Sequence, residues 1–73
     1  MITGEQVRVA RKLLGWSQLA LALEAGVTQG TVANFETGKK HLSVLSVSTI
    51  KRTLEGAGVE FAEGEPGVRL RGG

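Results

Sequence analysis

Two glutamines, Gln18 and Gln29, lie eleven residues apart, and each directly follows a hydroxyl residue, Ser17 or Thr28. Serine and threonine favour the position that caps the start of a helix, so both amides are expected in the first turns of two helices. A glutamine amide is both a donor and an acceptor, and it can pair with N6 and N7 of adenine in a bidentate manner. The chemistry of the two amides is thus suited to hydrogen bonding with a base edge. The alternative is a pair of surface glutamines near two helix starts.

Composition argues against most other chemistry. The 73 residues include no cysteine, no aspartate and a single histidine. Without cysteine there is neither a disulfide nor a thiolate metal site, and no serine, histidine and carboxylate converge to support nucleophilic catalysis. We therefore expect no enzyme, no metal site and no cofactor.

The charge and hydropathy of the sequence bear on its partners and on its cellular location. The net charge of +2 is a weak argument for a polyanionic partner, but residues 1–55 carry seven bases and only four acids. The sequence contains no leader-like segment and no run of about 18 apolar residues. A chain of this length forms one small domain, and we expect a cytoplasmic protein without a membrane contact.

Four helices are predicted from local start and stop signals. Thr3 and Gln6 have the spacing of a capping box, and apolar residues three and four positions apart follow them. Glycine suits the left-handed conformation at which helices commonly end. The predicted helices run from the caps Thr3, Ser17, Thr28 and Ser43 to the glycines Gly15, Gly26, Gly38 and Gly56.

After Gly58 the apolar period changes from that of a helix to that of a strand. Residues 59–61 and 68–70 alternate apolar and charged side chains, and the turn-forming sequence AEGEPG lies between them. This pattern predicts a short hairpin in which Glu60 faces Arg69 or Arg71 across the strands. We expect residues 1–58 to form a helical unit and residues 59–73 to be a hairpin appendage of the same compact domain.

The stretch from residue 18 to residue 35 has the features of a helix-turn-helix. Ala22 is small where two helices must approach, Gly26 lies at the turn, and Leu21, Val32 and Phe35 are candidate core residues. The sequence GWSQLALALEAGVTQGTVANFETGK, residues 15–39, resembles the XRE family of phage-repressor and Cro-like regulators. The resemblance implies a mainly α, lambda-repressor-like bundle of four to five short helices, here with a short C-terminal β-hairpin. It also implies that helix 28–36 enters the DNA major groove.

The resemblance implies roles for individual polar side chains. Gln29 would read a base, while Gln18 would contact phosphate and brace Gln29. Thr31 and Asn34 are further candidates for base reading. The alternative for Thr31 is a supporting role in the first helical turn, and the alternative for Asn34 is a solvated surface position. Gly30 stands where phage repressors often carry a base-reading side chain, so specificity is expected to depend on the other residues of this helix.

Other positions match residues that bind the DNA backbone or hold the family's fold together. Thr28, Lys39 and Lys40 match phosphate-contacting positions, where lysines supply salt-dependent affinity without sequence information. The alternatives are an N-cap role for Thr28, which is compatible with a phosphate contact, and a solvated lysine pair. Arg11 and Glu36 match a structural ion pair between the first and third helices.

Four leucines depart from the expected surface pattern. Leu19 and Leu23 occupy positions in the second helix that are normally polar in the family, and Leu42 and Leu45 flank the start of the fourth helix. Exposed leucines can be incidental, whereas a cluster would indicate an interface with a second copy or with another protein.

These features predict sequence-specific binding of double-stranded DNA by a transcriptional regulator, acting as a repressor. A homodimer on an inverted-repeat operator is expected, because two-fold protein symmetry matches two half-sites. Dimerisation could use the hairpin edges or the region of Leu42 and Leu45. The alternative function is a protein-interaction module, such as an antitoxin or adaptor, that uses this fold mainly to bind a protein partner through Leu19 and Leu23.

Overall fold

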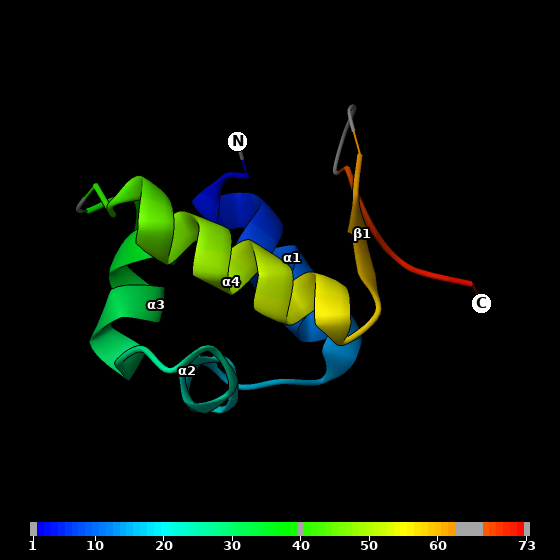
Figure 1. The fold of residues 1–73 in the computed structure, drawn as a ribbon, viewed down its shortest axis with the longest axis horizontal. Helices are drawn as coiled ribbons and strands as arrows, with labels where there is room; N and C mark the ends of the chain where they lie inside the picture. Colours follow the sequence, from blue (N-terminus) through cyan, green and yellow to red (C-terminus); the bar gives the residue numbers. More distant parts are fainter. Residues whose placement is uncertain (1, 40, 63–66, 73) are drawn as a thin grey trace.

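The computed structural model describes residues 2–39, 41–62 and 67–72. Four helices are followed by an antiparallel two-stranded hairpin (Figure 1), which confirms the predicted mainly α architecture with four of the expected four to five helices. The elements are α1 (Gly4–Leu14), α2 (Gln18–Ala25), α3 (Gln29–Thr37), α4 (Val44–Gly56), β1 (Val59–Phe61) and β2 (Val68–Leu70).

The helices begin and end at the predicted signals. At the start of α1, the Gln6 amide donates to Thr3 Oγ1 over 3.1 Å and the Thr3 amide donates to Gln6 Oε1 over 2.9 Å, which completes the capping box. The other three helices have single hydroxyl caps at Ser17, Thr28 and Ser43. The first three helices each end at a glycine in the left-handed conformation, with φ near 70° at Gly15, Gly26 and Gly38.

The hydrophobic core draws on every helix. Its largest fully buried side chains are Val7 of α1, Leu21 of α2, Val32 of α3, Ile50 and Leu54 of α4, and Val59 of β1. Val44, three positions before Val47 in the same helix, is 73% exposed. At about 100° per residue, Val44 lies at the edge of the stripe formed by Val47, Ile50 and Leu54, and it belongs to the first turn of the helix.

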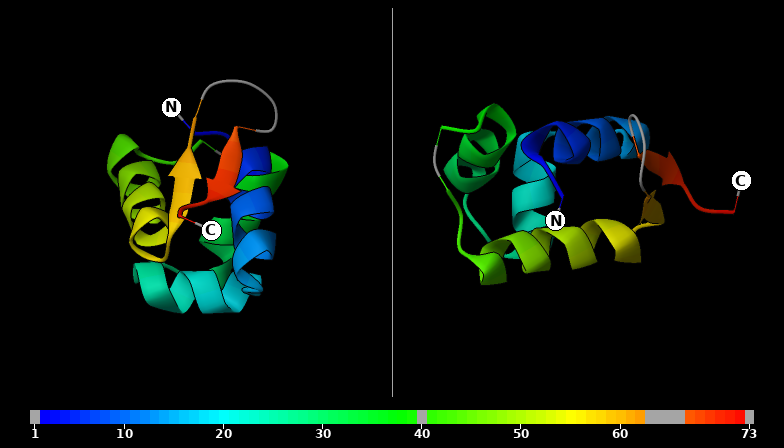
Figure 2. Two further views of the ribbon diagram at one scale, coloured as in Figure 1. Left: turned by 90° about the vertical axis from the view of Figure 1, so that its right-hand side faces the viewer. Right: turned by 90° about the horizontal axis from the view of Figure 1, so that it is seen from above.

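The hairpin packs against the helices α1 and α4. Its strands lie between them, in the order α4, β1, β2, α1 (Figure 2), with β1 against α4 and β2 against α1. Glu60 is opposite Arg69, and Arg69 Nε donates to Glu60 Oε1 over 2.9 Å, so Arg69 rather than Arg71 is the cross-strand partner. Residues 63–66 of the predicted turn lie outside the described residues.

The first turn of α1 touches the last turn of α3 at Gly4. A Cβ atom at this position would collide with the carbonyl oxygen of Phe35 and would lie 2.9 Å from the Cα atom of Glu36. Both obstacles are backbone atoms, so they cannot yield by rotating a side chain. The close packing of α1 on α3 therefore requires glycine at residue 4.

Replacing Gly4 by alanine is expected to lower the free energy of unfolding by about 1–3 kcal/mol, the usual cost of overpacking. Urea denaturation provides the measurement. Gly30→Ala is the matched control, because a Cβ there would meet only Thr28 Oγ1 at 3.9 Å. Alanine is favoured over glycine within helices by roughly 0.5–1 kcal/mol, so the control should be unchanged or more stable. If both substitutions change the free energy of unfolding by the same amount, the close packing of α1 on α3 does not require glycine at residue 4.

Candidate nucleic-acid interface

Helices α2 and α3 are joined by a tight turn and pack directly on each other. Leu21 and Ala22 of α2 and Val32 of α3 are buried, so the small side chain predicted to permit the close approach lies in the core. After Gly26, the Val27 amide donates to the Ala22 carbonyl over 3.0 Å, which completes the end of α2 and starts the turn. This packing fixes the direction of α3 relative to the rest of the molecule.

The first turn of α3 presents polar groups to solvent. Gln29, its first residue, is exposed, and Thr28 caps the helix by accepting from the Thr31 amide over 3.1 Å. The hydroxyls of Thr28 and Thr31 also lie 2.9 Å apart, so the two side chains form one hydrogen-bonded unit. Asn34 lies one turn further on and is half-buried. The N-terminal end of a helix carries partial positive charge and favours phosphate nearby.

Gly30 leaves an open position in this turn. The residue is exposed, and its φ is not positive, so the backbone does not require glycine there. Apart from the Thr28 hydroxyl at 3.9 Å, nothing outside the local backbone would lie near an added Cβ. The surface between Gln29 and Thr31 therefore consists of accessible backbone with no side chain above it.

Glu36, near the other end of α3, holds the helix in place. Arg11 of α1 donates from Nε to Glu36 Oε2 over 2.8 Å and from Nη2 to Glu36 Oε1 over 3.1 Å. The Glu36 side chain is 3% exposed and that of Arg11 is 13% exposed, so this bidentate pair is shielded from water. The hydrogen bond to Glu36 raises the pKa of Arg11 above its ordinary value, which keeps the guanidinium charged.

Two further hydrogen bonds extend this pair to the start of α2. Gln18 Nε2 donates to Glu36 Oε1 over 3.2 Å, and Arg11 Nη1 donates to the Trp16 carbonyl over 2.9 Å. The Gln18 amide is therefore bonded to Glu36, and the bracing of Gln29 by Gln18 that the resemblance implies stays a prediction. The contact to the Trp16 carbonyl was not expected, because no side-chain pattern in a sequence reveals which backbone carbonyl an arginine will reach.

Basic residues follow α3. Lys39 is exposed, and its amide donates to the Asn34 carbonyl over 3.1 Å, which holds the start of the loop against the helix end. His41 is exposed as well. The predicted phosphate contact at Lys40 lies outside the described residues. Lys39 and His41 therefore lie in the loop that leaves the C-terminal end of α3.

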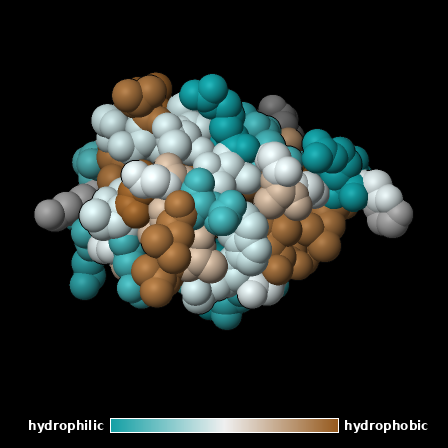
Figure 3. Space-filling model, turned by 60° about the horizontal axis from the view of Figure 1, so that its bottom comes forward, coloured by the Kyte–Doolittle hydropathy of each residue, from teal (hydrophilic) through white to brown (hydrophobic). Residues whose placement is uncertain are grey.

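The four leucines proposed as an interface do not share one environment. Leu23 is 73% exposed, Leu45 is 72% exposed and Leu19 is half exposed. Leu42 instead packs against the core and is only partly accessible, which corrects the expectation that it would accompany Leu45 at the surface. Figure 3 shows apolar side chains reaching one face of the molecule in separate patches divided by polar residues.

Two short helices joined by a tight turn, the second with an exposed polar first turn, define a helix-turn-helix protein. Residues 7–61 match the helix-turn-helix family HTH_3. The chain therefore belongs to this family, which is of the XRE and Cro-CI type, and the resemblance carried by residues 15–39 is confirmed. Such domains are typical of non-enzymatic DNA-binding proteins, which indicates DNA as the partner.

The search of curated proteins found no match to this chain. None of the helices in residues 2–39, 41–62 and 67–72 is long and apolar enough to span a lipid bilayer.

Replacing Arg11 by methionine is expected to lower the free energy of unfolding by about 3–5 kcal/mol, because it leaves a buried carboxylate without its ionic partner. Chemical denaturation followed by far-UV circular dichroism measures the change. Arg8→Met is the matched control, since Arg8 pairs with Glu5 over 3.4 Å at the surface of α1. Exposed pairs of this kind contribute about 0.5 kcal/mol or less. Similar losses in both variants would show that the Glu36 network contributes little to stability.

Proposed function

We propose that this protein binds double-stranded DNA sequence-specifically and regulates transcription, with α3 in the major groove. The observation that carries the proposal is the first turn of α3, which is exposed and polar while the other end of the helix is anchored by Glu36. A recognition helix needs this combination, because base readout requires side chains that are accessible to DNA on a backbone that does not move. Membership of the helix-turn-helix family supports DNA as the ligand.

The contacts divide into base reading and backbone positioning. In this proposal Gln29 reads a base edge through its amide, which can both donate and accept hydrogen bonds, and Thr31 and Asn34 are further readers along the same helix. Positioning on the phosphate backbone falls to Gln18, Thr28, Lys39 and Lys40. The hydrogen bond from Gln18 to Glu36 supports this role for Gln18, because it uses one of the two amide protons and leaves the other for a phosphate oxygen.

In this proposal the protein acts as a homodimer that binds an inverted repeat in DNA. Its location is the cytoplasm of a bacterium or of a phage-infected cell. Two copies related by a two-fold axis present two α3 helices to half-sites about one DNA turn apart. Occupation of such an operator next to a promoter blocks transcription, so repression is the proposed outcome.

A second candidate function is that of an antitoxin or adaptor that binds mainly a protein. Exposure of Leu19 and Leu23, four residues apart on α2, favours it. Selection of bound duplexes from random DNA by the purified chain distinguishes the two functions. An enriched half-site supports the regulator, and a chain that enriches no sequence supports the protein-interaction module.

Gln29→Ala is expected to weaken binding to the selected site by about 1–3 kcal/mol and to leave binding to random DNA intact. The physical reason is the loss of one bidentate base contact from a helix whose backbone position is unchanged. Fluorescence anisotropy with labelled duplexes measures both affinities. If affinity for random DNA falls by the same factor, Gln29 does not read a base.

Lys39→Ala is expected to weaken binding to all duplexes alike and to reduce the slope of log K against log salt concentration by about one unit, since one fewer counterion is released. Lys12→Ala, on the exposed surface of α1, is the matched control and should leave the slope unchanged. The measurement is a salt titration of binding for each variant. Equal slopes for wild type and Lys39→Ala would remove Lys39 from the phosphate contacts.

A further inference from the structure

The exposed surface of α3 carries no charge. The helix contains no lysine or arginine, and its one charged side chain, Glu36, is 3% exposed and bonded to Arg11 and Gln18. The accessible polar side chains of α3 are hydroxyls and two amides, Gln29 at the first position and Asn34 five residues later. Among the residues that the structure describes, no side-chain hydrogen bond occupies either amide. Both amides are therefore available to a ligand.

The cations nearest to α3 do not reach its first turn. Arg11 donates from Nε and Nη2 to Glu36 and from Nη1 to the Trp16 carbonyl, so each nitrogen of its guanidinium is already engaged. The basic residues of the following loop begin at Lys39, after the helix has ended, and this end is opposite Gln29. In a helix-turn-helix, the N-terminal residues of the recognition helix contact base edges. Neither Arg11 nor the loop therefore supplies a cation where bases are read.

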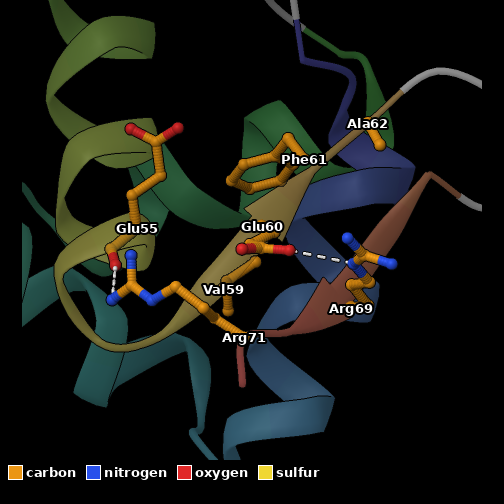
Figure 4. Close-up of a pocket in the computed structure, with 7 residues that line it drawn as sticks. All are labelled: Glu55, Val59, Glu60, Phe61, Ala62, Arg69 and Arg71. Atoms are coloured by element: carbon orange, nitrogen blue, oxygen red, sulfur yellow. Dashed lines mark hydrogen bonds and ion pairs between the residues drawn. The ribbon is translucent and has the colours of Figure 1, made fainter. Parts of the chain in front are cut away.

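The two arginines of the hairpin are engaged elsewhere. Arg69 Nε donates to Glu60 Oε1 over 2.9 Å, and Arg71 Nη2 donates to the Glu55 carbonyl over 3.3 Å (Figure 4). Strand β1 and α3 lie at opposite ends of the molecule (Figure 1), so these guanidinium groups are remote from Gln29. In the proposed complex, with α3 in the major groove, base recognition therefore falls to uncharged side chains.

Each base is recognised in the major groove by its own kinds of side chain. Arginine and lysine pair with O6 and N7 of guanine, and aspartate and glutamate accept from N4 of cytosine. Glutamine and asparagine pair with N6 and N7 of adenine, whereas serine and threonine are less selective. The exposed surface of α3 thus lacks the residue types that read a G·C pair, and it has two side chains of the type that reads adenine.

Gly30 leaves space for this readout. Asn34 lies four residues after Gly30, so the two positions share one stripe of α3, and helical side chains lean toward the N-terminal end of the helix. A Cβ at residue 30 would meet only the Thr28 hydroxyl, at 3.9 Å. The absence of a side chain at residue 30 therefore leaves open space between the first turn of the helix and the Asn34 amide.

We infer that the half-site read by α3 presents adenines, in A·T base pairs, to Gln29 and Asn34. Each amide donates to N7 of its adenine and accepts from the N6 amino group. The inference rests on the proposed DNA-binding function and names the bases that this function selects. It follows from the uncharged surface of α3, because a G·C pair at either position would meet no side chain of the matching type.

Selection of bound duplexes from random DNA by wild type, Gln29→Ala and Asn34→Ala locates the base that each amide reads. A position whose preference disappears in one variant is the position read by the deleted amide, and we expect adenine there in both cases. Glu24→Ala, on the exposed surface of α2, is the matched control and should select the wild-type site. Circular dichroism of each variant checks that its helices are intact.

Deletion of single atoms from the DNA then tests the contact itself. At the position read by Gln29, adenine is replaced by purine, which lacks the N6 amino group, or by 7-deazaadenine, which lacks N7. Each replacement should weaken wild-type binding by about threefold or more, since it removes one bond of a bidentate contact. The same replacements should change the affinity of Gln29→Ala by less than about twofold, because the contact is already absent. Replacement of an adenine outside the half-site is the control.

Adenine at both positions, with wild-type affinity lowered by both replacements, supports the inference. A G·C pair at either position overturns it, as do alanine variants that select the wild-type site. Replacements that affect wild type and Gln29→Ala equally also overturn it. In each of these cases an enriched half-site leaves the proposed DNA-binding function standing. A wild type that enriches no sequence contradicts that function, and the inference falls with it.

Discussion

The buried carboxylate of Glu36 is the constraint on which the arrangement of the first three helices depends. A carboxylate near the C-terminal end of a helix is opposed by the helix dipole, and removal from water adds a further cost. Three hydrogen bonds from Arg11 and Gln18 offset these costs, and their donors come from α1 and α2. Tilting α3 away from its neighbours would leave this charge unpaired in a dry environment. The orientation of α3 is therefore set at the end of the helix opposite Gln29.

The boundaries of the helices could be predicted from the sequence because their causes are local. A capping hydroxyl accepts from an amide three residues later, and a glycine at the end adopts a positive φ without strain, so a few consecutive residues contain the whole signal. The same is true of the hairpin, where alternation and turn residues predicted strands at residues 59–61 and 68–70. Small, turn and apolar residues between positions 18 and 35 predicted the helix-turn-helix, and the match over residues 7–61 confirms the family resemblance.

Apart from the Arg11–Glu36 ion pair, which the family resemblance implied, properties that depend on distant parts of the chain were not predicted. Leu42 and Leu45 differ by three positions and look equivalent in the sequence, yet only Leu45 is strongly exposed, because the core covers the first of them. Gly4 looks like an ordinary helix residue until the backbone of α3 is placed beside it. The partner of Gln18 likewise depends on where Glu36 arrives after folding. Each of these features is decided by packing between elements, for which a single sequence carries no direct signal.

The open position at Gly30 bears on how this protein could evolve. Stability and recognition usually compete for the same residues, so a change that alters one tends to damage the other. Gly30 lies between two candidate readers, has ordinary helical geometry and supports nothing in the core. A mutation there can add a side chain to the proposed recognition surface without disturbing the packing that holds α3. Under the proposed DNA-binding function, a lineage with glycine at residue 30 could therefore acquire a new sequence preference in a single step, with its fold intact.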